Sequence, residues 1–117
     1  MRIVRVHETA EADHRRVVKQ VFEHHTVVDC GVAVFAPGEC AHCDEEHRHA
    51  DDEVFVILSG EVTVPITGGP TGVARAGDWV HVRAGEEHHL TNHTHLPCVA
   101  MYLMLRGGWA SRDKGER

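Results

Sequence analysis

The feature that most constrains the fold is a pair of histidines two residues apart, His47 and His49, followed by Glu53. In a β-strand, residues i and i+2 project from the same face, so the two imidazoles are expected side by side while Arg48 points away. Imidazole and carboxylate groups together suit divalent iron, manganese, nickel or zinc, whereas calcium requires more oxygen ligands and structural zinc usually more thiolates. The segment therefore predicts strand structure that carries a transition-metal site.

A second segment, residues 77–92, reads as a strand, a glycine turn and a histidine that opens the next strand. Together the two segments resemble the motifs of the cupin family. The first motif, G-x5-H-x-H-x3-E-x6-G, fits from its first histidine onward at His47, His49, Glu53 and Gly60. The second motif, G-x5-P-x-G-x2-H-x3-N, fits at Gly77, Gly85, His88 and Asn92.

The chain departs from the family pattern at two positions. Gly38 precedes His47 by eight intervening residues instead of five, so the loop at 39–46 is longer, and Arg83 stands where the second motif has proline. The resemblance covers about residues 27–105. It implies an all-β fold, a single cupin barrel of the jelly-roll type, with one divalent transition metal ion (Fe, Mn, Ni or Zn) held by His47, His49, Glu53 and His88.

Composition agrees with one domain that spans residues 1–117, because this length and an apolar content of 42% can supply one core. The formal charge of -6 argues against a nucleic-acid partner. No apolar run is long enough to span a bilayer and the N-terminus lacks the apolar centre of a signal peptide, so we expect no membrane partner and a cytoplasmic location.

Glycine and proline residues divide the chain into short runs rich in β-branched residues, at a spacing typical of an all-β sandwich or barrel. These runs predict strands at 27–36, 54–59, 61–66, 73–75, 79–82, 88–92 and 99–105. The strands at 54–59 and 61–66 are expected to pair as a hairpin. Residues 15–23 fit a helix face or a strand, and the family resemblance favours the strand. The tail, residues 107–117, is expected to be frayed.

The chain has twelve histidines, and most of them cannot be metal ligands. Solvated surface roles are expected for His14, His24, His25 and His89. Others are open to either an outward strand position or a place near the pocket, because alternation does not fix the strand phase across bulges: His42, His81, His93 and His95.

Cys40 and Cys43 form a C-x2-C pair just ahead of His47. A closed zinc site would need further ligands at similar local spacing, but Cys30 and Cys98 stand alone in the sequence. Reduced thiols are therefore expected for an intracellular chain. A second metal site or a redox function is the open alternative.

Four protein ligands on an octahedral ion leave two positions for water, dioxygen or a chelating substrate, so the predicted site is open. It indicates a small metal-dependent enzyme, a dioxygenase-type oxygenase or an isomerase or lyase, that acts on a small oxygen-rich molecule. The alternative is a non-catalytic metal or metabolite sensor. Trp79, Met101 and Tyr102 are candidates to line the pocket, and the Tyr102 hydroxyl is the candidate catalytic acid or base.

Alternation from residue 53 to residue 58 divides this strand into two faces. We expect one face to point inward, toward the metal: Glu53, Phe55 and Ile57. We expect the other face to point outward: Val54, Val56 and Leu58. The outward apolar side chains predict a homodimer.

Overall fold

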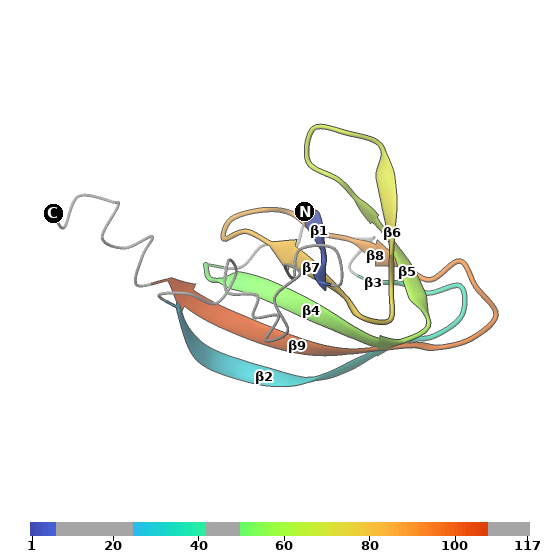
Figure 1. Ribbon diagram of the computed structural model, residues 1–117, viewed down its shortest axis with the longest axis horizontal. Helices are drawn as coiled ribbons and strands as arrows, with labels where there is room; N and C mark the ends of the chain where they lie inside the picture. The colour runs from blue at the N-terminus through green and yellow to red at the C-terminus, as the bar shows by residue number, and fades with distance from the viewer. Residues whose placement is uncertain (7–24, 42–49, 108–117) are drawn as a thin grey trace, which may run out of the picture.

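The computed structural model describes residues 1–6, 25–41 and 50–107 (Figure 1). Nine strands lie within these ranges: β1 (Arg2–Arg5), β2 (His25–Phe35), β3 (Cys40–Ala41), β4 (Asp52–Ser59), β5 (Glu61–Pro65), β6 (Thr71–Arg75), β7 (Asp78–Val82), β8 (Leu90–Thr91) and β9 (Cys98–Gly107). The predicted all-β class is confirmed. Within the same ranges, no helix has both the length and the apolar character that a membrane crossing requires.

The strands form two antiparallel sheets. The larger has the order β1-β7-β4-β9-β2 and the smaller the order β3-β8-β5-β6. In Figure 1, β2, β9 and β4 run alongside one another as the long ribbons of the larger sheet. The described strands therefore make a jelly-roll sandwich whose sheets are not hydrogen-bonded into one closed barrel.

The predicted hairpin between 54–59 and 61–66 is wrong. β4 pairs with β7 and β9, whereas β5 pairs with β6 and β8, so the two strands belong to different sheets. Only Gly60 separates them, which is one residue fewer than the shortest common hairpin loop. Gly60 has a φ of 77°, and a side-chain carbon there would lie 2.5 Å from the Pro97 carbonyl oxygen. The chain crosses between sheets at a position that only glycine fits.

Most other predicted strands overlap observed ones, with small differences at their ends. The exception is the strand expected at 88–92, which shortens to Leu90–Thr91. Two observed strands were not predicted, β1 and β3. The strand expected at 15–23 and the tail beyond Gly107 lie outside the described residues.

The core lies between the sheets and follows the predicted alternation of β4. Glu53, Phe55 and Ile57 are all buried, and the ring of Phe55 meets that of Phe35 edge-on at 6.0 Å between centroids. The buried residues of this hydrophobic core come from both sheets and from the first residue of the chain: Met1, Phe35, Phe55, Ile57, Val62, Val64, Ala74, Val80, Val82, Leu90, Cys98 and Ala100.

The outward face of the larger sheet carries a second, smaller apolar cluster. Val54 is fully buried there with Val4 and Leu105, and Val56 and Trp79 pack against them. The predicted outward direction of Val54, Val56 and Leu58 is therefore correct, although Val54 is covered there by side chains of the same chain. Strand β1, which sequence analysis did not predict, adds Val4 to this cluster. Leu58 remains 50% exposed.

Candidate functional site

Two of the four predicted metal ligands meet between the sheets. Glu53 lies on β4, and His88 lies just before β8 of the smaller sheet. Both are buried, with 6% and 0% of their surface exposed, and Glu53 Oε1 lies 3.4 Å from His88 Nε2. Glu53 points inward because it shares the face of Phe55 and Ile57. The fold therefore brings together a carboxylate and an imidazole that are 35 residues apart in the sequence.

The other two predicted ligands, His47 and His49, lie outside the described residues. Within the ranges that the structure does describe, no group of three or more His, Cys, Asp or Glu side chains is arranged to hold a metal ion. The structure thus places half of the predicted ligand set and leaves the metal assignment a prediction.

Asn92, the last residue of the second motif, links separate parts of the backbone through its side-chain hydrogen bonds. Its side chain is fully buried, and its Nδ2 donates hydrogen bonds to the carbonyl oxygens of Phe35 and Leu96, both at 2.8 Å. Its Oδ1 accepts hydrogen bonds from the backbone N–H and the hydroxyl of Thr94, at 2.9 and 2.7 Å. Asn92 therefore ties the end of β2 to the loop that follows β8. The motif identified this residue, but only the structure shows its role.

Arg83 occupies the proline position of the second motif, and its backbone N–H makes a hydrogen bond. It donates a hydrogen bond to Glu86 Oε1 at 3.0 Å, which proline could not do. The other carboxylate oxygen of Glu86 accepts a hydrogen bond from the Thr67 hydroxyl at 2.6 Å and pairs with the Met1 ammonium group. Burial alone would raise the pKa of the Glu86 carboxyl, but these hydrogen bonds and the ammonium charge hold that pKa below its ordinary value.

Of the three side chains proposed to line the pocket, only Tyr102 packs against the inner core cluster. A side-chain carbon at Gly31 would lie 2.7 Å from the Tyr102 ring, so the ring occupies the space that the glycine leaves. Met101 is 37% exposed and Trp79 packs into the outer cluster, so neither lines the interior. The catalytic role of Tyr102 stays a prediction.

His81 is buried, but on the outward face of the larger sheet, because its neighbours Val80 and Val82 fill the core. Its Nδ1 accepts a hydrogen bond from Arg2 Nε at 2.9 Å, and its Nε2 lies 2.9 Å from Asp52 Oδ2. Burial would raise the pKa of the Asp52 carboxyl, but its hydrogen bonds with His81 and with the Ala84 backbone N–H hold that pKa below its ordinary value. His81 therefore belongs to a separate polar cluster.

The remaining described histidines take surface or near-surface positions. His93 and His95 are exposed, which agrees with the outward position that was one of the two alternatives for them. His25 and His89 are partly buried, and each lies near a carboxylate: Asp52 at 3.8 Å and Glu87 at 2.8 Å. His14, His24 and His42 lie outside the described residues.

The cysteines differ from the expectation of reduced thiols throughout. Cys40 is disulfide-bonded, whereas Cys30 and Cys98 are free. Cys43 lies outside the described residues. Burial, with a smaller effect from the Glu61 charge, raises the pKa of the Cys98 thiol to about 11.

The sequence profile of the cupin domain matches residues 31–104. No curated protein sequence matches the chain.

Among solved structures, the chain is similar to a cupin 2 conserved barrel domain protein from Salinispora arenicola, with 26% identity and a TM-score of 0.54 over 73% of this chain and 66% of that one. It is also similar to the DMSP lyase DddQ from Ruegeria pomeroyi, with 28% identity and a TM-score of 0.55 over 67% of this chain but only 37% of the lyase.

A third similar structure is the cupin domain of an XRE family transcriptional regulator from Enterobacter cloacae. It has 22% identity and a TM-score of 0.55 over 65% of this chain and 78% of that one, a likeness that shows the fold alone. The profile match covers more than half of the chain, and its ends bracket both motifs. The chain belongs to the cupin family.

Proposed function

We propose that this cupin binds one divalent transition metal ion between its sheets, through His47, His49, Glu53 and His88, and acts as a small metal-dependent enzyme. The observation that carries the proposal is the buried pair of Glu53 and His88, whose Oε1 and Nε2 atoms lie 3.4 Å apart. A carboxylate buried in an apolar core is costly unless a positive charge compensates it. A divalent ion would supply that charge and would use both atoms as ligands.

The position of His47 and His49 in the chain supports the same assignment. The segment 42–49 begins after β3, which pairs with β8 immediately beyond His88, and ends shortly before β4, which carries Glu53. The described strands on either side of the segment therefore adjoin the buried pair. A carboxylate and imidazole nitrogens form a donor set that suits iron, manganese, nickel or zinc.

When bound, such an ion supplies Lewis-acid polarisation of a substrate oxygen. With one anionic ligand the site keeps positive charge, which favours a small substrate that bears a carboxylate, an enolate or adjacent oxygens. Tyr102, partly buried against the same core, is the candidate to hold or move a proton through its hydroxyl. Oxygenase chemistry and isomerase or lyase chemistry both fit this description. Similarity to DddQ at 28% identity favours a lyase, although that protein is much longer than the matched region.

The test is the metal content of the purified chain and of matched variants, measured by elemental mass spectrometry. Glu53→Gln keeps the shape of the side chain and removes its charge, and His88→Gln removes the imidazole. The control is His93→Gln, which alters an exposed histidine. We expect the wild type and the control to retain a divalent ion and the two site variants to lose most of it.

Thermal unfolding of the same four proteins distinguishes a loss of metal caused by a missing ligand from a loss caused by misfolding. Equal metal content in all four would overturn the proposed site. A turnover screen of small carboxylates and diols then tests the enzyme assignment. Tight metal binding without turnover would favour the alternative function, a metal or metabolite sensor.

A further inference from the structure

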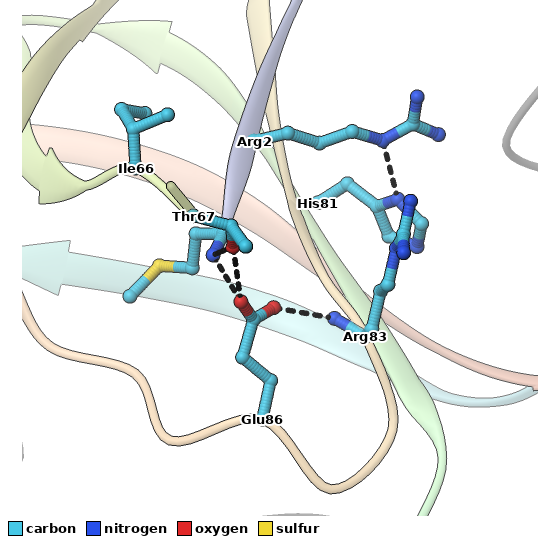
Figure 2. Close-up of a pocket in the computed structure, with 7 residues that line it drawn as sticks. Arg2, Ile66, Thr67, His81, Arg83 and Glu86 are labelled. Atoms are coloured by element: carbon cyan, nitrogen blue, oxygen red, sulfur yellow. Dashed lines mark hydrogen bonds and ion pairs between the residues drawn. The ribbon is translucent and has the colours of Figure 1, made fainter. Parts of the chain in front are cut away.

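A pocket of about 290 Å³ lies outside the interior site, where the start of β1 meets the turns that follow β5 and β7 (Figure 2). Its volume is close to the lower end of small-molecule sites, about 300 Å³. Both apolar and charged side chains line it: Met1, Arg2, Ile66, Thr67, His81, Arg83 and Glu86. None of these residues is a predicted metal ligand, and the nearest link to one is the backbone carbonyl of Glu86, which lies 3.4 Å from His88 Nδ1.

The arginines that line this pocket differ from the other described arginines. Arg5 pairs with Asp78, Arg75 pairs with Glu61 at 3.1 Å, and Arg106 pairs with Asp51 at 3.2 Å.

Arg2 and Arg83 have no carboxylate within ion-pair distance among the described residues. In a chain with a formal charge of -6, two guanidinium groups without carboxylate partners at one pocket mark a local excess of positive charge.

The acidic residue of the pocket is already engaged. The Glu86 carboxylate pairs with the Met1 ammonium group, accepts a hydrogen bond from the Thr67 hydroxyl and accepts another from the Arg83 backbone N–H. These contacts leave its charge compensated by the ammonium group rather than by either guanidinium. The positive charge of Arg2 and Arg83 is therefore available to a ligand.

His81 fixes the direction of Arg2. An arginine Nε–H can only donate, so His81 Nδ1 is the acceptor at 2.9 Å and the neutral ring carries its proton on Nε2, where it donates to Asp52. With Nε held in this way, the terminal nitrogens of Arg2 remain as donors. In Figure 2 the side chain of Arg83 extends in the direction of the His81 ring, which Arg2 contacts.

We propose that this pocket binds a small phosphate monoester or free phosphate, with the phosphoryl oxygens held by the guanidinium groups of Arg2 and Arg83. Guanidinium groups match phosphoryl oxygens in geometry and charge. The apolar walls that Met1 and Ile66 provide, and the volume of the pocket, favour an organic substituent on the phosphate. Arg83 stands where the family motif has proline, so this chain has a cation at a position where the pattern provides none.

The experiment is isothermal titration of the full chain with glycerol phosphate and with inorganic phosphate, at constant ionic strength. Arg83→Gln is the principal variant, because Arg83 is exposed and its side chain makes no hydrogen bond or ion pair with the described residues. Arg2→Gln is the second variant, and its folding is checked by thermal unfolding. The matched control is Arg75→Gln, which alters an arginine that is already paired with Glu61.

We expect saturable binding to the wild type, weakened about tenfold or more by each pocket variant, a change that corresponds to at least about 1.4 kcal/mol. Binding should be unchanged in the control Arg75→Gln, whose side chain does not line the pocket. Three results would overturn the proposal: no saturable binding, equal loss in Arg75→Gln and Arg83→Gln, or binding of a dicarboxylate as tight as that of phosphate. Tighter binding of the ester than of free phosphate would support the organic substituent.

Discussion

Replacing Asn92 with alanine should destabilise the fold severely, because its fully buried side chain makes four hydrogen bonds. A typical protein hydrogen bond contributes about 0.5–1.5 kcal/mol net, and a buried acceptor left without a donor costs about 1–3 kcal/mol. The Phe35 carbonyl is such an acceptor, since its bond to Asn92 is buried. We therefore expect Asn92→Ala to lower the free energy of unfolding by about 3–5 kcal/mol.

This loss is a large part of the stability of a domain of this size, which is about 5–15 kcal/mol. Urea denaturation followed by circular dichroism measures it. The control is His93→Ala at the exposed neighbouring position, for which we expect a change within about 0.5 kcal/mol. Asn92→Asp separates the donated hydrogen bonds from the accepted ones, because a carboxylate keeps the acceptor for Thr94 but cannot donate to Phe35 and Leu96. A loss below about 1 kcal/mol for Asn92→Ala would refute the linking role.

Three further predictions concern pH, thiol reactivity and assembly. The pKa of Asp52 is lowered in the folded protein, so its carboxylate stabilises the folded state at pH values above its ordinary pKa of 3.8. This contribution is lost as the pH falls through the lower pKa of the folded state. The free energy of unfolding of Asp52→Asn should therefore fall less steeply with acid than that of the wild type. Thiol labelling should modify exposed Cys30 rapidly and Cys98, which is buried with a pKa of about 11, only on unfolding, whereas equal rates would contradict the burial of Cys98. The homodimer predicted from the sequence should use the outward face of β2 and β9, where Val32 is 64% exposed, so sedimentation should show a dimer that Val32→Lys dissociates, and a monomeric wild type would contradict it.

Sequence alternation predicted the parts of the fold that depend on local periodicity. The inward positions of Glu53, Phe55 and Ile57 follow from a period of two along a strand. The two motifs likewise predicted that Glu53 and His88 would meet, although Glu53 lies in the larger sheet and His88 just before a strand of the smaller one.

The features that were missed depend on contacts far away in the sequence. β1 is four residues long and exists through its pairing with β7, and the two-residue β3 exists through its pairing with β8. Neither is long enough to show a periodic pattern. The false hairpin arose because 54–59 and 61–66 are adjacent in the sequence, whereas their partners are β7, β9, β6 and β8.

The polar cluster of Arg2, Asp52 and His81 was not predicted for the same reason. Arg2 is 79 residues from His81 in the sequence, and only the pairing of β1 with β7 places them side by side. The function of Arg83 was also missed, because its departure from the motif indicated only a changed turn. The structure adds that its backbone N–H closes the turn with Glu86 and that its side chain lines a pocket.

X-ray absorption spectroscopy of the zinc-loaded chain tests the central claim most directly, because it reports which atoms bind the metal. Zinc bound by Glu53, His88 and the two predicted histidines should show nitrogen and oxygen ligands at about 2.0–2.2 Å, with the multiple scattering typical of imidazole. The signal should fall in His88→Gln and persist in His93→Gln. A shell of sulfur at about 2.3 Å would instead place the metal on cysteine and contradict the proposed site.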